Sequence, residues 1–261
     1  MLKYKHYGNS PFDLVLLHGG PGAFDSLNVF AKELAIGRGV ILPRLEIESL
    51  YALLKELAAL IEKRADHPVS LLGHSFGALV AIALAGAYPQ LTKKIILVGC
   101  PALQSGYEDQ LKINRQTKLE AAQRQHLKQL EDDLDKASST VEQNVVFGKL
   151  GEFWEQVDGV DLLQLPAHKQ EVSYQSYLDL WPQAVEWREK GKFVESCLQL
   201  QCPVVLIQGD HDSHPFSAPL KTFEEVGIDY TSYLLEKCGH SPWRERQTRE
   251  EFFRILDQEL L

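Results

Sequence analysis

The sequence predicts an α/β protein with a mostly parallel, doubly wound sheet and one helical insertion. Short apolar runs alternate with helical patterns along the chain, which favours a parallel sheet covered on both faces. The first five runs are continuous rather than alternating, as strands buried on both faces require. A long segment, residues 103–198, contains no convincing strand and therefore predicts helices inserted between two strands.

Six main strands are predicted, each at an apolar run: residues 14–17, 40–42, 69–72, 95–98, 204–207 and 230–235. Before residue 14, only residues 2–7 could form another strand. Three helices follow from apolar spacing. They cover residues 47–64, residues 76–88, which end at Pro89, and a last helix carrying Phe252, Phe253, Leu256 and Leu260.

The insertion has two parts of different composition. Residues 112–136 are rich in Gln, Lys, Glu, Asp and Leu, which favours helix. Residues 174–193 are rich in aromatic side chains. We therefore divide the chain into a core of residues 1–102 and 199–261 and an insertion of residues 103–198.

Composition limits the classes to which the protein can belong. The chain has 261 residues, 44% hydrophobic content and a net charge of -9. This balance argues against nucleic acid or an anionic membrane surface as a partner. No apolar run is long enough to span a bilayer, and the N-terminus has no apolar signal core. The four cysteines, Cys100, Cys197, Cys202 and Cys238, lack C-x-x-C spacing, so we expect reduced thiols in a cytoplasmic protein.

The segment Gly73-His74-Ser75-Phe76-Gly77 joins a predicted strand to a predicted helix. A G-x-S-x-G motif in this context is a nucleophile elbow, a sharp turn that exposes one serine hydroxyl at the end of a sheet. Glycines two residues before and after the serine let strand and helix approach each other closely. The motif predicts Ser75 as a nucleophile. A turn serine without catalytic role is the alternative.

A serine hydroxyl needs a base, normally a histidine oriented by a carboxylate. In this architecture the order is serine, acid, histidine. The strand at residues 204–207 leads to two aspartates, Asp210 and Asp212. We favour Asp212, because the turn places it clear of the strand end, whereas Asp210 can hydrogen-bond its own turn. After the next strand, Gly239-His240-Ser241-Pro242-Trp243 offers His240 as the base, and Cys238 is interpreted as a small buried thiol.

Acyl transfer also needs backbone N–H donors for an oxyanion. The residue after the nucleophile, Phe76, supplies one. The loop after the strand at residues 14–17 reads His18-Gly19-Gly20-Pro21-Gly22, and we assign Gly20 as the second donor with Gly19 as the fallback. His18 is expected to brace this loop, and His74 to have a structural role.

Taken in order, these four motifs resemble the α/β-hydrolase superfamily over most of the chain outside the insertion. The resemblance implies an α/β-hydrolase fold in which Ser75 is the nucleophile, Asp212 the acid and His240 the base. It also implies that the insertion is a helical cap that roofs the site. The His-Gly-Gly-Pro-Gly loop is similar to that of the proline iminopeptidase branch and of esterases.

Two features depart from the iminopeptidase pattern. That branch usually carries Gly-Gly-Ser-Trp-Gly at the elbow, where this chain has Gly-His-Ser-Phe-Gly. It also carries an Asp-Gln-Arg-Gly segment after the strand matching residues 40–42, where this chain has Pro43-Arg44-Leu45. A more open pocket wall is expected there.

The leading hypothesis is therefore a serine hydrolase that forms an acyl-enzyme with a small carboxylic ester or amide. It implies a small-molecule substrate and no metal or cofactor. Candidate substrate-binding residues are Gly19 and the cap aromatics Phe153, Trp154, Trp181 and Trp187, although for any single aromatic, packing within the cap is the favoured explanation. The cap carboxylates Glu152, Glu155 and Glu171 are candidates for holding a free amine.

Three alternatives stay open. One is a proline iminopeptidase-like aminopeptidase. Another keeps the triad but cleaves carbon–carbon or thioester bonds, or eliminates. The third is a non-catalytic binding protein on a hydrolase scaffold. The residues do not decide the oligomeric state.

Overall fold

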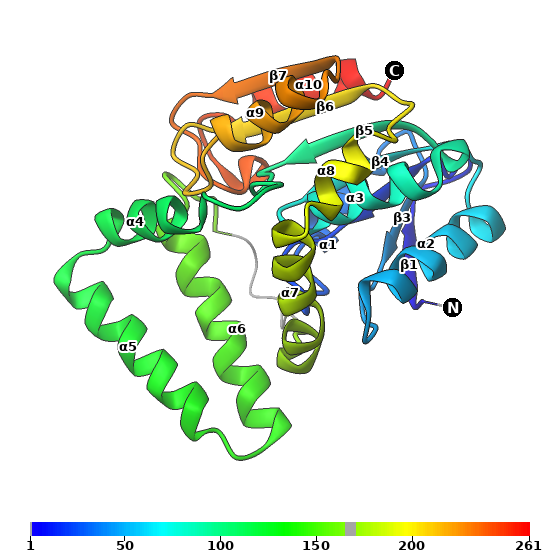
Figure 1. The fold of residues 1–261 in the computed structure, drawn as a ribbon. Coiled ribbons are helices and arrows are strands. Elements are labelled where there is room, and N and C mark those ends of the chain that lie inside the picture. The colour runs from blue at the N-terminus through cyan, green and yellow to red at the C-terminus, as the bar shows by residue number, and fades with distance from the viewer. Residues whose placement is uncertain (1, 165–170) are drawn as a thin grey trace.

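A seven-stranded sheet forms the centre of the protein (Figure 1). The computed structural model describes residues 2–164 and 171–261. The strand order is β1-β3-β2-β4-β5-β6-β7, and only β1 runs antiparallel, pairing Tyr4 with Pro43. The strands are β1 (Tyr4–Tyr7), β2 (Leu14–Leu17), β3 (Val40–Pro43), β4 (Val69–His74), β5 (Thr92–Val98), β6 (Val204–Gly209) and β7 (Tyr230–Leu235). This arrangement confirms the predicted fold class and all six main strands.

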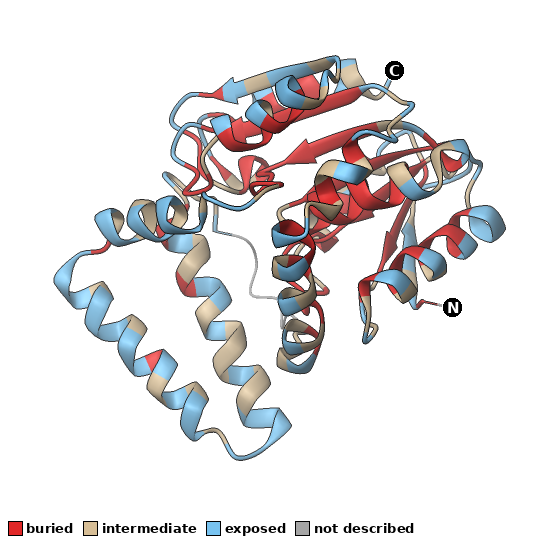
Figure 2. Ribbon diagram, in the orientation of Figure 1, coloured by how far each residue is buried: buried red, intermediate tan, exposed pale blue. Residues whose placement is uncertain are grey.

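Helices cover both faces of this sheet (Figure 2). On one face lie α2 (Leu50–Arg64), α3 (Phe76–Ala87), α8 (Lys192–Cys197) and α9 (Ser217–Val226). On the other lie α1 (Asn28–Leu34) and α10 (Arg249–Glu259). Two single-turn 3₁₀ helices, η1 (Pro89–Leu91) and η2 (Pro242–Arg244), complete the core. Helix α2 starts at Leu50 rather than residue 47, because Ser49 caps it by accepting a hydrogen bond from the Ala52 N–H.

The insertion contains α4 (Glu108–Lys118), α5 (Ala121–Lys136), α6 (Thr140–Val157) and α7 (Tyr174–Glu189) before α8. The helix expected at residues 112–136 is two helices. Leu119 is extended and buried against Leu130 and Phe153, and Glu120 starts α5 through a capping box with Gln123. Burial of one leucine and a local cap therefore interrupt a sequence whose composition favours continuous helix.

The insertion is physically divided. Helices α5 and α6 form an antiparallel hairpin that projects from the body and buries a small cluster of its own (Figure 1). Helices α7 and α8 instead pack on the core: Leu180, Ala184, Trp187 and Phe193 belong to the same buried cluster as α2 and α3. Helices α5 and α6 thus stand apart from the sheet, whereas α7 packs on the core.

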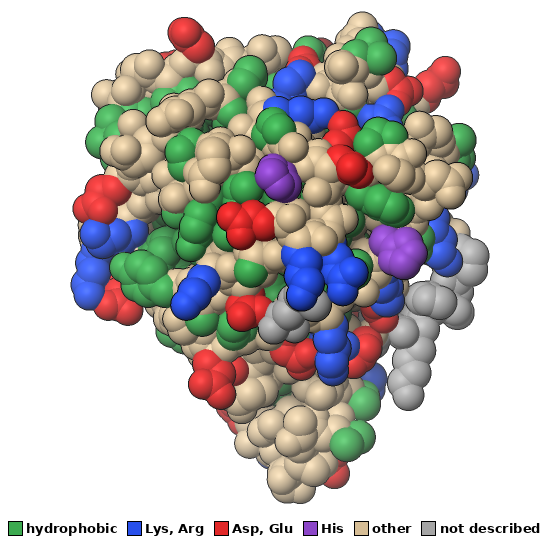
Figure 3. All heavy atoms as spheres, turned by 90° about the vertical axis from the view of Figure 1, so that its right-hand side faces the viewer, with side chains coloured by type: hydrophobic (Ala, Val, Ile, Leu, Met, Phe, Trp, Pro, Cys, Tyr) green, Lys and Arg blue, Asp and Glu red, His purple; other side chains and the backbone are tan. Residues whose placement is uncertain are grey.

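The surface is mixed in charge. On the face in Figure 3, acidic and basic side chains are interspersed. Ion pairs such as Lys93–Asp13 and Arg44–Glu46 join charges at the surface. Within the two described ranges, no helix has the length and apolar character needed to cross a bilayer.

Candidate active site

Ser75 lies in a sharp turn between β4 and α3. Its backbone has φ 54° and ψ -120°, a conformation that a non-glycine residue adopts only under constraint. Its N–H donates to the Val98 carbonyl at 2.9 Å, which ties the turn to β5. Within residues 69–85 Ser75 alone is partly exposed, and every other residue there is buried. The turn therefore presents one hydroxyl at the carboxyl edge of the sheet.

The elbow glycines are required by close packing. A Cβ atom on Gly73 would lie 2.3 Å from the Gly77 carbonyl oxygen, and one on Gly77 would lie 2.0 Å from the Leu17 carbonyl oxygen. No side chain fits at either position. The strained turn is thus maintained by the contact of α3 with β2 and β4.

Asp212 and His240 meet at the ends of β6 and β7. His240 Nδ1 lies 2.7 Å from Asp212 Oδ2, and Asp212 Oδ1 accepts the His214 N–H at 2.8 Å. The Asp212 side chain is fully buried. Burial alone would raise its pKa, but His240 and the His214 N–H hold that pKa well below its usual range. Asp212 is therefore ionised, and it orients the imidazole.

At His240, the charges of two aspartates offset the effect of burial on the pKa. Desolvation lowers the pKa of a buried histidine, yet Asp212 and then Asp158 raise the pKa of His240 above its ordinary value. The competing aspartate, Asp210, is exposed and bonds His211 Nδ1 and the Cys238 N–H instead. The structure thus brings Asp212, and not Asp210, to His240.

His74 connects the elbow to the histidine loop. Its Nε2 lies 3.0 Å from the His240 carbonyl oxygen, so this nitrogen carries the proton and donates it. The two rings are 4.6 Å apart between centroids, and the Trp243 ring meets His74 edge-on at 4.7 Å. Burial holds the pKa of His74 well below its ordinary value, so His74 is neutral. A neutral, packed His74 agrees with the structural role expected for it.

The glycine-rich loop after β2 approaches the nucleophile. A Cβ atom on Gly19 would lie 3.1 Å from Ser75 Cβ, so only glycine fits there. Gly20 is exposed with φ +40°, and the N–H of Phe76 belongs to the first turn of α3, where no intrahelical acceptor exists. The assignment of these two N–H groups as oxyanion donors stays a prediction. His18 braces the loop as predicted: its Nε2 accepts the Leu45 N–H at 3.0 Å, and burial lowers the pKa of His18 to about 4.

The four aromatic candidates separate into two pairs. Phe153 lies in the buried hairpin cluster and Trp187 in the main core, so both are committed to packing. Trp154 is half-buried under the Arg115 guanidinium, 4.5 Å from the ring centroid. Trp181 is half-buried and stacks on Tyr177 at 6.2 Å. Only the second pair has surface left for a ligand.

The carboxylates proposed for amine binding are largely occupied. Glu155 pairs with Arg244, and Glu171 pairs with Arg44 at 2.5 Å. Glu152 is exposed on α6. Arg44, at the place where a more open wall was expected, also stacks on the Phe24 ring at 3.8 Å and so fills part of that wall.

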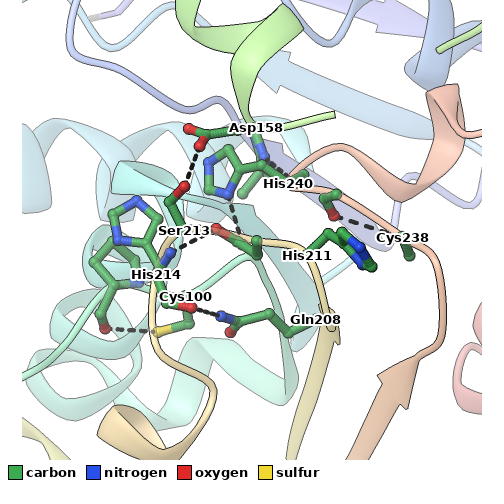
Figure 4. Close-up of polar contacts among 12 residues, drawn as sticks. Cys100, Asp158, Gln208, His211, Ser213, His214, Cys238 and His240 are labelled. Atoms are coloured by element: carbon green, nitrogen blue, oxygen red, sulfur yellow. Dashed lines mark hydrogen bonds and ion pairs between the residues drawn. The ribbon is translucent and has the colours of Figure 1, made fainter. Parts of the chain in front are cut away.

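Three residues beside the triad escaped the sequence analysis. Gly99, at the end of β5, has φ +58°, and a Cβ there would lie 2.8 Å from His240 Nδ1. Its position directly after a buried strand was a usable signal. His214 and Asp158 carried no signal, because their proximity to His240 depends on loop and cap placement (Figure 4).

Asp212, His214 and His240 offer donor atoms within 4.8 Å of one another, the kind of set that holds metals. Two of those donors already bond each other at 2.7 Å, so a metal ion would have to break the His240–Asp212 contact. The cysteines supply no thiolate for metal or nucleophilic chemistry nearby, since all four are free thiols and burial raises the pKa of Cys238 to about 12.

Comparison with known proteins decides the family. A family model described as "Alpha/beta hydrolase family" matches residues 14–254, nearly the whole chain. The chain belongs to this family. No match to this hydrolase was found among curated proteins.

Solved structures share the hydrolase's fold at low sequence identity. A structure reported among carboxylesterases of Nitrososphaera gargenis has a TM-score of 0.67 at 17% identity, covering 99% of this chain and 93% of its own. A monoacylglycerol lipase of Paleococcus ferrophilus has a TM-score of 0.62 at 16% identity, covering 100% and 98%. VinJ has a TM-score of 0.67 at 16% identity, covering 98% and 93%. At these identities, the comparisons show a shared fold alone.

Proposed function

We propose that this hydrolase cleaves small carboxylic esters through an acyl-enzyme formed on Ser75. The observation that carries the proposal is the 2.7 Å contact of His240 Nδ1 with the buried Asp212 carboxylate, on the same sheet edge as the strained Ser75 turn. A histidine so oriented keeps its other nitrogen, Nε2, for a proton from a hydroxyl.

The proposed reaction has two halves. Ser75 Oγ attacks the ester carbonyl carbon while His240 Nε2 takes the hydroxyl proton. The oxyanion is held by the N–H groups of Phe76 and Gly20. Collapse of the tetrahedral intermediate breaks the bond to the alcohol oxygen, which leaves with the proton from His240. Water, deprotonated by His240, then attacks the acyl carbon; the bond to Ser75 Oγ breaks, His240 returns the proton to Ser75 and the acid leaves. Asp212 stays ionised throughout.

The cap supports an ester rather than a peptide substrate. An aminopeptidase needs a carboxylate free to hold the substrate's amine, but Glu155 and Glu171 are paired with arginines. The half-buried rings of Trp181, Tyr177 and Tyr174, stacked along one face of α7, offer an apolar surface suited to an acyl chain. We therefore assign substrate binding to the part of residues 103–198 that includes Trp154 and Trp181, and catalysis to the core.

The test combines a fluorophosphonate probe with a small substrate panel. Wild type, Ser75→Ala and Ser138→Ala, an exposed serine at the tip of the cap hairpin, are treated with p-nitrophenyl acetate, butyrate and octanoate and with proline β-naphthylamide. We expect probe labelling and ester turnover in wild type and Ser138→Ala. In Ser75→Ala, labelling disappears and turnover falls by about 10⁶.

Other outcomes identify other functions. Prolyl turnover would favour the aminopeptidase and direct attention to Glu152. If the probe labels the protein but no substrate of the panel is turned over, carbon–carbon or thioester chemistry would be favoured. Folded wild type that takes no label would contradict the proposal and favour a binding protein.

A further inference from the structure

A buried carboxylate of the cap, Asp158, lies beside the triad and has no part in the chemistry above. It is the C-cap residue of α6, and its side chain is 2% exposed. Arg115 donates to Oδ2 from Nε at 3.1 Å and from Nη2 at 2.7 Å, while Ser213 Oγ donates to Oδ1. Burial alone would raise the pKa of Asp158, but Arg115, His240 and these bonds hold it below its usual range. The group is therefore a buried anion with both oxygens hydrogen-bonded.

Asp158 contacts both loops that carry the triad. Its carboxylate holds Ser213, the residue after Asp212. Its backbone carbonyl accepts the His240 N–H at 2.9 Å. Figure 4 shows the carboxylate directed at Ser213, beside His240 and His214. One cap residue thus fixes the backbone of the base and the neighbour of the acid.

Helix α4 reinforces the same contact. Asn114, Arg115 and Lys118 lie on one side of α4: Arg115 binds Asp158, and the other two reach the loop that follows β6 and carries Asp212 (the acid loop). Asn114 Nδ2 donates to the Ser213 carbonyl at 2.9 Å, Lys118 Nζ donates to the His211 carbonyl, and Lys118 also lies 3.7 Å from Asp158. In Figure 1, α4 accordingly sits against the loops that follow β6 and β7.

A second set of contacts holds the cap segment after Asp158. The Glu245 carboxylate accepts the N–H groups of Val160 at 3.0 Å and Asp161 at 2.8 Å, and that of Gly239 at 2.9 Å. Gly239 directly precedes His240. The cap segment around Asp158 and the histidine loop therefore bind the same carboxylate, which fixes the position of Asp158 relative to His240.

We propose that Asp158, a residue of the cap, is a positioning residue for the triad. Its contacts with both catalytic loops keep Asp212 and His240 at their hydrogen-bonding distance. The inference rests on the proposed function, because positioning matters only if His240 acts as a base. Its charge contributes as well. The groups that act on His240 are Asp212, Asp158, Arg115, His214 and His74, and of these the two carboxylates favour the protonated ring.

The test compares Asp158→Asn with Asp161→Asn. Both variants remove one carboxylate from the same cap segment. The Asp161 carboxylate pairs with Arg246 at 3.5 Å, away from the contacts of Asp158. For Asp158→Asn we expect kcat to fall by up to about 100-fold, as for small misplacements of reacting groups, with KM changed far less. The acid limb of the pH–rate profile moves to lower pH. Asp161→Asn leaves kcat and the limb unchanged.

A direct readout does not depend on turnover. Titration of His240 by NMR in the resting protein should show a lower midpoint in Asp158→Asn than in wild type and Asp161→Asn. If wild type proves inactive, the ester proposal fails, yet this titration still tests the coupling. Wild-type kcat together with a wild-type His240 midpoint in folded Asp158→Asn overturns the inference.

Asp158→Asn leaves the Arg115 charge without its partner and can fail to fold. Ser213→Ala avoids this, because it removes one hydroxyl and leaves the Arg115–Asp158 pair. Thermal unfolding establishes that each variant is folded. In folded Ser213→Ala a loss of kcat without a shift of the acid limb supports positioning through the acid loop, and unchanged kcat counts against it.

Discussion

A methyl group on Gly99 would lie 2.8 Å from the Nδ1 atom of His240, the nitrogen that bonds Asp212. It would also lie 3.2 Å from Asp212 Oδ2. The end of β5 therefore forms a floor beneath the contact between acid and base. A third strand, which supplies no catalytic side chain, sets how closely the other two loops approach.

Gly99→Ala should disable the triad. The Cβ pushes His240 away from Asp212, and φ +58° adds a backbone penalty of about 1–2 kcal/mol. We expect at least about a tenfold loss of kcat, measured with the ester panel. Gly191→Ala is the control, because Gly191 has φ +68° but open space around a Cβ. Equal activity losses in both variants would mean that backbone strain, and not the contact with His240, is responsible.

Replacing the two aspartates after β6 should separate their roles. Asp212→Asn removes the charge that orients His240, and we expect kcat to fall by about 10⁴. Asp210→Asn affects an exposed turn that bonds His211 and Cys238, so its kcat should stay close to wild type. Initial rates at saturating ester distinguish the two. A larger loss in Asp210→Asn would reverse the assignment of the acid.

Activity should depend on the protonation of His240. The base is active when neutral, and its pKa is raised by Asp212, so the rate falls as pH decreases through a midpoint above 6.5. A profile of kcat/KM from pH 5 to 9 measures this midpoint in the free enzyme. A midpoint below 6.5 would show that desolvation outweighs the two carboxylates.

Stability should decrease in acid because of three buried neutral histidines. Burial lowers the pKa of His18 to about 4 and of His214 to about 3, and lowers that of His74 as well. The unfolded chain binds these protons near pH 6.5, so their contribution is complete above that pH and is lost as pH falls below it. Each histidine adds a slope of about 1.4 kcal/mol per pH unit.

Denaturant unfolding between pH 4 and 7 measures this slope. His214→Gln should reduce it by about 1.4 kcal/mol per pH unit. His240 acts in the opposite direction, because its raised pKa favours the folded state below that pKa. A slope unaffected by His214→Gln would contradict the assignment of His214 as buried and neutral.

The two tryptophans of α7 should respond differently to truncation. Trp187 belongs to the main core, where it packs against Phe193, so Trp187→Ala should cost about 3–5 kcal/mol of stability. Trp181 is half-buried on the aromatic face of the helix, so Trp181→Ala should chiefly raise KM for octanoate over acetate. Unfolding curves and the chain-length series measure these effects. An unchanged octanoate preference in Trp181→Ala would remove Trp181 from the acyl site.

The parts of the molecule that the sequence predicts are those with local causes. Continuous apolar runs identify strands buried on both faces, and the spacing of Gly73 and Gly77 around Ser75 identifies the elbow. The order of Asp212 and His240 after successive strands predicts them as acid and base, because parallel strands end at one edge. Each prediction rests on residues that lie within or directly after one strand.

The remainder depends on contacts between distant segments. Asp158 sits in a cap segment without a motif, and its role arises only when α4 and the two catalytic loops close around it. In α7, Leu180, Ala184 and Trp187 lie at helical spacing and form a core face, which the aromatic composition of the segment alone does not predict.

The proposed triad is drawn from strands on either side of the insertion, so the proposed activity would need both parts of the core. Ser75 precedes the turn at Ala137, Ser138 and Ser139 that joins α5 to α6, and Asp212 and His240 follow it. A chain cut at that exposed turn would yield two pieces, neither holding a whole triad. Hydrolysis would return only when β5 of one piece pairs with β6 of the other, so ester turnover would report the reunion of two fragments.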